Sequence, residues 1–134
     1  MDNEGQNIQQ RTLNFAVRVV KLCQFLHKQG GVGKVLSNQL IRSGTSIGAN
    51  IREAQSAQSD RDFLHKLEIA LKEARETEYW LIVLVEAEVI QESKVNALKE
   101  ESTAIIKILI AITKKLKEKQ LRLKNSKLQN RGNK

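Results

Sequence analysis

The 134-residue sequence contains no proline and only one cysteine, one tryptophan and one tyrosine. Without proline, nothing in the chain forces a break inside a long helix. Aromatic residues make up only 4% of the chain, so a core must be built from Leu, Ile, Val and Ala. The single cysteine, Cys23, has no second cysteine with which to form an internal disulfide. These scarcities favour long helices with an aliphatic core.

Targeting and membrane-spanning signals are also missing. The opening stretch MDNEGQNIQQ is acidic and polar, unlike a secretory signal. No apolar run approaches the ~20 residues that a helix needs to span a bilayer. We therefore expect a cytoplasmic protein.

Positive charge is concentrated at the C-terminal end. The net charge is +8, and residues 107–134 hold ten Lys/Arg against one acid, Glu118. Residues 1–106 hold 13 bases and 14 acids, a balance of −1. Such asymmetry indicates a polyanionic partner or a solubilising helix end. We predict a four-helix core over residues 1–113 and a basic C-terminal helix extension or frayed tail over 114–134.

Hydrophobic periodicity predicts four helices, at about 8–28, 35–56, 60–89 and from 93 onward. The stretch QGGVGK (29–34) separates the first two, and Ser59 and Ser93 are expected to cap the last two. Short connections favour an all-α, antiparallel up-down-up-down four-helix bundle. Leu13, Val17 and Val20 form a second apolar patch on the first helix. An extra apolar face left in water is unfavourable, so we expect a homo-oligomer.

The stretch RSGTSIGANIREAQS (42–56) looks like a loop but keeps helical spacing. Gly44 and Gly48 stack on one face, where they would let a neighbouring helix approach closely. The core stripe is flanked on its other side by polar residues, and the third helix places two more on its core side. We expect a link from this flank to the third helix that fixes helix register. The residues of this structural polar layer are Ser43, Ser46, Asn50, Thr77 and Glu78.

Residues 39–81 resemble the four-helix-bundle family named after the 23S ribosomal RNA intervening-sequence protein. The resemblance rests on a Gln-Leu-x-Arg-Ser/Ala-x-x-Ser-Ile-x-x-Asn-Ile-x-Glu run, followed by an aromatic-led helix carrying Ile-Ala and then Glu. The matching residues are Gln39, Leu40, Arg42, Ser43, Ser46, Ile47, Asn50, Ile51, Glu53, Phe63, Ile69, Ala70, Glu76 and Glu78. The resemblance implies a homopentamer, and that some members are encoded inside insertions in ribosomal RNA genes. The biochemical role of the family is unestablished.

A structurally similar relative of that family is the accessory protein of diversity-generating retroelements. That relative is a basic pentamer that binds a reverse transcriptase and nucleic acid. No motif places the present sequence in this subgroup, so the likeness is one of fold and charge.

No motif predicts catalysis, a cofactor or a metal site. The stretch GGVGK resembles a phosphate-binding loop, but Lys28 and Val35 stand where that pattern needs Gly and Ser/Thr. Asp62, His65 and Glu68 are spaced for one helical turn, which is more typical of a solvated face than of a metal site. We expect a protein that is not an enzyme.

The basic arm carries the functional signal. Its cations could bind phosphates of RNA or DNA without reading bases, lie on an anionic membrane, or solvate a helix end. A membrane anchor would usually contain Trp or Phe, and the arm has neither. We favour a non-enzymatic accessory protein that associates with nucleic acid, with RNA preferred over DNA. The alternative is a protein–protein scaffold, with a protein encoded nearby as its partner. The candidate nucleic-acid-binding residues are Lys107, Lys114, Lys115, Lys117, Lys119, Arg122, Lys124, Lys127 and Arg131.

Overall fold

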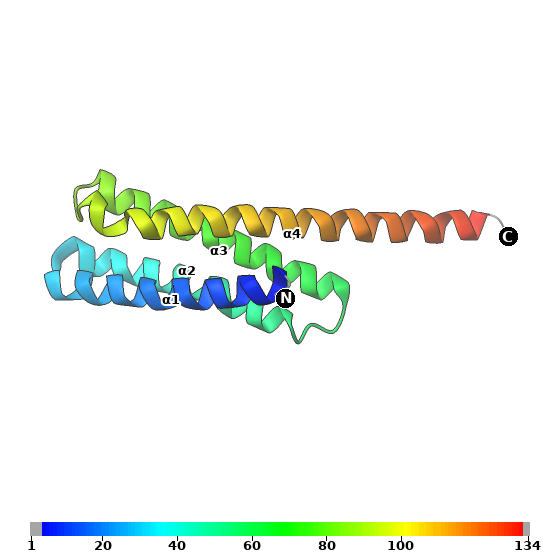
Figure 1. Ribbon diagram of the computed structural model, residues 1–134, viewed down its shortest axis with the longest axis horizontal. Coiled ribbons are helices and arrows are strands. Elements are labelled where there is room, and N and C mark those ends of the chain that lie inside the picture. The colour runs from blue at the N-terminus through cyan, green and yellow to red at the C-terminus, as the bar shows by residue number, and fades with distance from the viewer. Residues whose placement is uncertain (1–3, 133–134) are drawn as a thin grey trace.

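The computed structural model describes residues 4–132, with side chains from Ile8 onward. Within these residues it contains four helices and no strand: α1 (Glu4–Gln29), α2 (Gly31–Ala54), α3 (Asp60–Glu86) and α4 (Glu92–Gly132). The helices lie lengthwise beside one another, and α4 extends beyond the other three (Figure 1). The predicted all-α four-helix bundle is confirmed.

The core is almost entirely aliphatic, as the scarcity of aromatics predicts. Side chains at helical spacing on each helix meet along the bundle axis, and each fully buried Leu or Ile contributes roughly 1.5–3 kcal/mol. The largest fully buried apolar residues are Phe15, Val19, Leu26, Leu40, Ile47, Ile51, Leu81, Leu84, Val95, Ile105 and Leu109. Every helix therefore supplies one face to a single core.

The connection between α1 and α2 is a single residue, Gly30. Gly30 and Gly31 have φ of 75° and 63°, in the left-handed region that favours glycine. Gly33 is already helical, and a Cβ there would lie 3.1 Å from Val89 Cγ1. The predicted interruption over 29–34 was therefore too long, because only two of its three glycines carry the turn.

Local hydrogen bonds set the other helix ends. The Ser59 side chain accepts a hydrogen bond from the Asp62 backbone N–H at 3.0 Å, which confirms the predicted N-cap of α3. The helix ends at Glu86 rather than near Val89, because Glu88 adopts a left-handed φ of 59°. The expectation that Ser93 caps α4 is wrong, since that helix begins one residue earlier, at Glu92.

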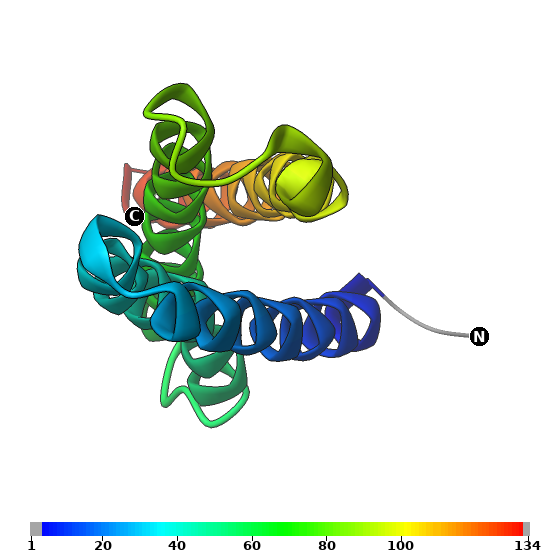
Figure 2. The same cartoon turned by 90° about the vertical axis from the view of Figure 1, so that its left-hand side faces the viewer.

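The four helices do not pack equally. Helix α1 packs closely on α2 and much more sparsely on α4, and the end-on view shows α1 and α4 well apart (Figure 2). One two-pronged ion pair joins them: Arg11 Nη2 and Nε donate to the Glu101 carboxylate at 2.7 and 2.9 Å. This hydrogen bonding raises the pKa of the Arg11 guanidinium above its ordinary value. The pair thus holds the most open side of the bundle together.

Candidate nucleic-acid interface

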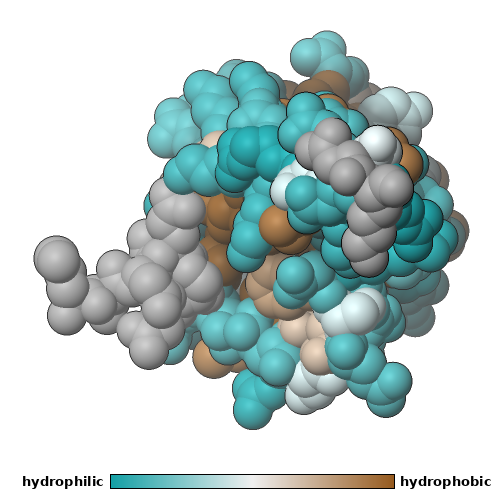
Figure 3. Space-filling model, turned by 90° about the vertical axis from the view of Figure 1, so that its right-hand side faces the viewer, coloured by the Kyte–Doolittle hydropathy of each residue, from teal (hydrophilic) through white to brown (hydrophobic). Residues whose placement is uncertain are grey.

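The basic arm is the C-terminal part of a continuous helix. Helix α4 runs unbroken from Glu92 to Gly132 and projects past the bundle (Figure 1). All nine cations predicted to bind nucleic acid are exposed on it. Seen from the end at which α4 projects, the surface is mostly hydrophilic, with apolar residues showing in a central recess (Figure 3).

The bundle holds the arm as far as Gln120. Leu116 packs against the core, and Lys117 Nζ lies 3.1 Å from Glu68 Oε2. The Gln120 amide donates to the Asp60 backbone carbonyl at 3.1 Å. Every residue from 121 to 132 is exposed. The structure thus divides the arm into a docked part and a projecting part, with Gln120 as the last contact.

The projecting part presents charge on more than one side. At ~100° per residue, Arg122 and Lys124 lie about 160° apart around the helix, and Lys127 and Arg131 fall nearer to Lys124. Three leucines, Leu121, Leu123 and Leu128, are half or more exposed, and no aromatic residue lies in this part of the chain. Such a helix can contact phosphates on two sides but has no ring on which a base could stack.

The expected polar link between α2 and α3 does not occur among the described residues. Asn50 Nδ2 donates to the Ser46 carbonyl at 2.8 Å, and the Ser46 hydroxyl donates to Arg42 O at 2.6 Å. Thr77 likewise donates to Glu73 O of its own helix at 2.8 Å. Ser, Thr and Asn commonly bond to the backbone one turn earlier in this way.

The remaining two polar residues also have other partners. Ser43 is fully buried and donates weakly to Leu40 O at 3.4 Å. Glu78 accepts from the Thr103 hydroxyl of α4 at 2.7 Å, so it joins α3 to α4 rather than to α2. Ion pairs join α2 to α3 instead. Arg42 donates to the carboxylates of Glu73 and Glu76, and Lys66 donates to Glu53 at 3.0 Å.

The two glycines of α2 lie against α1. A Cβ at Gly44 would lie 2.8 Å from Val19 Cγ1, closer than packed carbon atoms approach. At Gly48 it would lie 3.2 Å from the Thr12 hydroxyl. The glycines therefore serve close packing of helices, and no phosphate-binding loop is present at this point.

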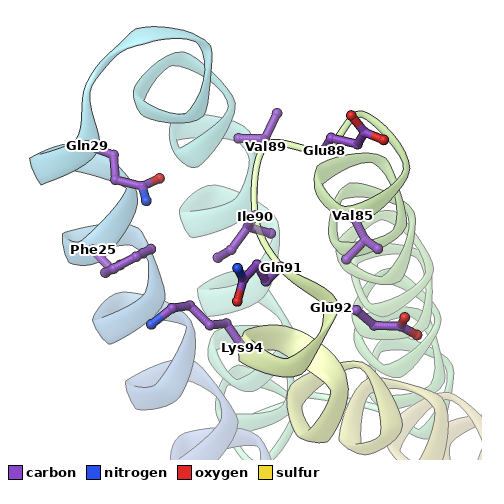
Figure 4. A pocket seen from close by; sticks show the side chains of 9 residues that line it. All are labelled: Phe25, Gln29, Val85, Glu88, Val89, Ile90, Gln91, Glu92 and Lys94. Atoms are coloured by element: carbon purple, nitrogen blue, oxygen red, sulfur yellow. The ribbon is translucent and has the colours of Figure 1, made fainter.

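A hollow of about 420 Å³ lies at the end of the bundle that holds the α3–α4 loop. Lys94 reaches into it toward Phe25, with Nζ 4.4 Å from the ring centroid, while Glu88 and Glu92 lie nearer α3 (Figure 4). Among the described residues, no group of three or more His, Cys, Asp or Glu could hold a metal ion. The hollow contains a cation–π contact and no arrangement of a nucleophile with a base.

Cys23 is buried against α2. The residue is 4% exposed, and its thiol donates weakly to the Ser37 carbonyl at 3.5 Å. Burial raises the pKa of this thiol from 9.0 to about 11. Because the thiolate is the reactive form, the environment of Cys23 is the opposite of that of an activated cysteine.

The sequence reasoning missed a segregation of charge within the body. Residues 5–52, which cover nearly all of α1 and α2, contain seven Lys/Arg and no Asp or Glu. Twelve of the fifteen acids fall between Glu53 and Glu101. The net balance over residues 1–106 conceals this separation, whereas a count helix by helix would have found it.

These features define a helical-bundle protein with a projecting basic helix and no recognisable catalytic centre in its described part. The chain matches the family described as 23S rRNA-intervening sequence protein over residues 4–111. It belongs to that family, which confirms the resemblance found in the sequence.

A solved relative supports this assignment. It is a crystal structure of a protein of unknown function from the S23 ribosomal protein family of Bacteroides thetaiotaomicron, 48% identical in sequence, with a TM-score of 0.77. The similarity covers 84% of the present chain and 99% of that one. No curated protein matches the chain. Among the described residues, no helix is both long enough and apolar enough to cross a membrane.

Proposed function

We propose that this protein is a non-enzymatic accessory protein of the cytoplasm that binds RNA through the projecting part of α4. The observation that carries the proposal is a continuous helix that holds Arg122, Lys124, Lys127 and Arg131 beyond Gln120, its last contact with the bundle. Cations at this density bind phosphates irrespective of base sequence, and the absence of aromatics argues against base stacking. The family name, which refers to an intervening sequence of ribosomal RNA, favours RNA over DNA.

We further propose that the antiparallel, up-down-up-down bundle assembles with copies of itself, as a homopentamer by analogy with the family. Exposed apolar side chains on two helices support assembly: Leu13 and Val17 on α1 are about half exposed, and Tyr79 on α3 is 58% exposed. Several arms on one assembly would multiply a weak phosphate affinity through avidity.

Fluorescence anisotropy with a labelled single-stranded RNA tests the function. The full chain is compared with a chain ending at Gln120, the last residue of α4 that contacts the bundle. We expect the shortened chain to keep its fold and to lose most of its affinity, and a DNA of the same sequence serves as the comparison ligand. Equal affinity of the two chains would contradict the proposal.

The exposed apolar side chains support a second candidate function, a protein–protein scaffold that binds no nucleic acid, with a protein encoded nearby as its partner. The same anisotropy measurement separates the two. A scaffold predicts no RNA binding by the full chain at moderate salt concentration.

A further inference from the structure

An apolar groove runs along the outer side of the α1–α2 pair. Two hollows mark it, of about 220 and about 430 Å³. The first is lined in part by Leu13, Gly48 and Arg52, and the second in part by Ile41 and Lys28. We call this surface the α1–α2 groove; it is lined by Leu13, Val20, Ile41 and Gly48. Val17 lies between the two hollows on the same side of α1, four residues after Leu13 and three before Val20.

The α1–α2 groove is uncovered within the chain. Leu13 is 52% exposed and Val17 47% exposed, so neither belongs to the core. A stripe of large apolar side chains between two helices is the shape that receives a helix of another molecule.

The charge around the groove selects an acidic partner. Lys28 and Arg52 lie at its two ends, and among the described residues neither pairs with a carboxylate. Residues 5–52 contain no acid, and Glu53, which follows Arg52, pairs with Lys66 of α3. A helix with an apolar stripe flanked by Glu or Asp would meet complementary charge at both ends of the groove.

The second half of α3 combines an apolar stripe with flanking acids. Tyr79 is exposed and packs edge-on against Trp80, with ring centroids 5.3 Å apart. They are the only Tyr and Trp of the chain, and Trp80 and Val83 are only partly buried. We call the surface formed by Glu76, Tyr79, Trp80, Val83 and Glu86 the α3 aromatic face.

The α3 aromatic face is acidic. From Glu76 to Glu92 the chain has five acids and no Lys or Arg. The cations beside this stretch are Arg42 of α2, which pairs with Glu76, Lys72 and Arg75 in the preceding turn of α3, and Lys94, which lines the same hollow as Glu88 and Glu92. Glu86 is exposed and, among the described residues, has no ion-pair partner.

We infer that the α1–α2 groove of one copy receives the α3 aromatic face of a second copy. This inference rests on the assembly in the proposed function, and it assigns the two surfaces that meet. Among the described residues, no Cα of α3 comes within 8 Å of a Cα of α1, so the α3 aromatic face of one copy does not lie in the groove of the same copy. Tyr79 and Trp80 supply aromatic anchors of the kind that dominate interfaces.

The two surfaces differ, so the contact is head-to-tail. Each copy offers one groove and one aromatic face, and the contact therefore repeats from copy to copy until a ring closes. A pairing of identical surfaces would instead stop at a dimer. The charges add direction, because the basic groove repels a second basic groove.

Size-exclusion chromatography with light scattering on three full-length variants tests the pairing. Val17→Glu places a carboxylate in the groove, and we expect a monomer at micromolar concentration. Tyr79→Ala removes the exposed ring, and we expect the concentration at half-assembly to rise by about thirtyfold or more. Val32→Glu adds the same charge at an exposed residue of α2 outside the groove and should leave assembly unchanged. Circular dichroism checks that all three remain helical.

Mixing the first two variants gives the sharpest result. The Val17→Glu copy keeps its aromatic face, and the Tyr79→Ala copy keeps its groove. Below the half-assembly concentration of Tyr79→Ala, we expect a one-to-one heterodimer that grows no further. This heterodimer, together with a Val32→Glu control that assembles like the wild type, would support the pairing of the groove with the aromatic face.

Other outcomes overturn the pairing. A Val17→Glu protein that assembles like the wild type refutes the groove and leaves self-assembly standing. Disruption by Val17→Glu without heterodimer formation in the mixture refutes the aromatic face as the occupant and points to another partner. A monomeric wild type refutes both self-assembly and this pairing, while RNA binding by the arm is decided separately by anisotropy.

Discussion

Gly44 of α2 lies directly against Val19 of α1, and a Cβ at Gly44 would come within 2.8 and 2.9 Å of the two methyl carbons of Val19. Val19 is fully buried, so an added methyl group would force Val19 or α1 to shift. A single missing side chain thus sets how closely the first two helices approach.

Gly44→Ala should therefore destabilise the fold. Overpacking costs roughly 1–3 kcal/mol, whereas alanine recovers about 1 kcal/mol of helix propensity. We expect a net loss of about 1 kcal/mol in the free energy of unfolding, measured by urea denaturation. Gly48→Ala is the matched control with a smaller expected cost, because its nearest neighbour atoms lie at 3.2–3.4 Å. A Gly44→Ala protein more stable than the wild type would show that α1 shifts freely.

Ser59→Ala should remove the N-terminal cap of α3. The Ser59 hydroxyl accepts from the Asp62 N–H, and loss of such a cap costs about 1 kcal/mol. Ser56→Ala is the control, since Ser56 is exposed in the same loop and caps no helix. Equal stability of the two variants in thermal unfolding would mean that the cap contributes little.

Periodicity predicted the core well because each helix has an apolar stripe that faces the bundle axis. Leu40, Ile47 and Ile51 recur at helical spacing in α2, and all three are fully buried. For a residue beside the core stripe, periodicity does not show which neighbouring helix its side chain contacts. Glu78 lies beside the seam of α3, and only the packing shows that it faces Thr103 of α4.

The polar flank of α2 was harder to predict for a different reason. A helix allows Asn50 to bond to the carbonyl of Ser46 without any neighbour, and this local bond competes with a link between helices. The sequence allows both hydrogen-bonding patterns and does not show which one forms.

The basic arm was easier to predict, because its charge depends on composition alone. The position of Gln120 as its last docked residue could be found only from the fold.

The stability of the protein should fall with rising pH through the titration of Cys23. Burial raises the pKa of the thiol from 9.0 to about 11 in the folded state. Between these values the unfolded chain loses the proton that the folded chain keeps, so the folded state loses stability as pH rises. The contribution is present in full below pH 9.

Comparison of Cys23→Ala with the wild type isolates this effect, because the two proteins share every other ionisable side chain. From pH 9 to 11, we expect the wild type to lose about 2 kcal/mol more in its free energy of unfolding than the variant. The measurement is urea denaturation at each pH. If the free energies of unfolding of the two proteins fall in parallel as pH rises, the thiol is not held protonated by burial.

Binding of RNA by the arm should depend on salt in proportion to the phosphates that it neutralises. For single strands, the slope of log affinity against log salt concentration is about −0.7 per phosphate contact. Lys124→Gln combined with Lys127→Gln removes two cations of the projecting part and should reduce the slope by about 1.4. Lys72→Gln combined with Arg75→Gln removes the same charge from exposed positions on α3. If both double variants lower the slope equally, RNA binding depends on the net charge of the protein and not on the cations of the arm. The geometry of α4 then has no special role in binding.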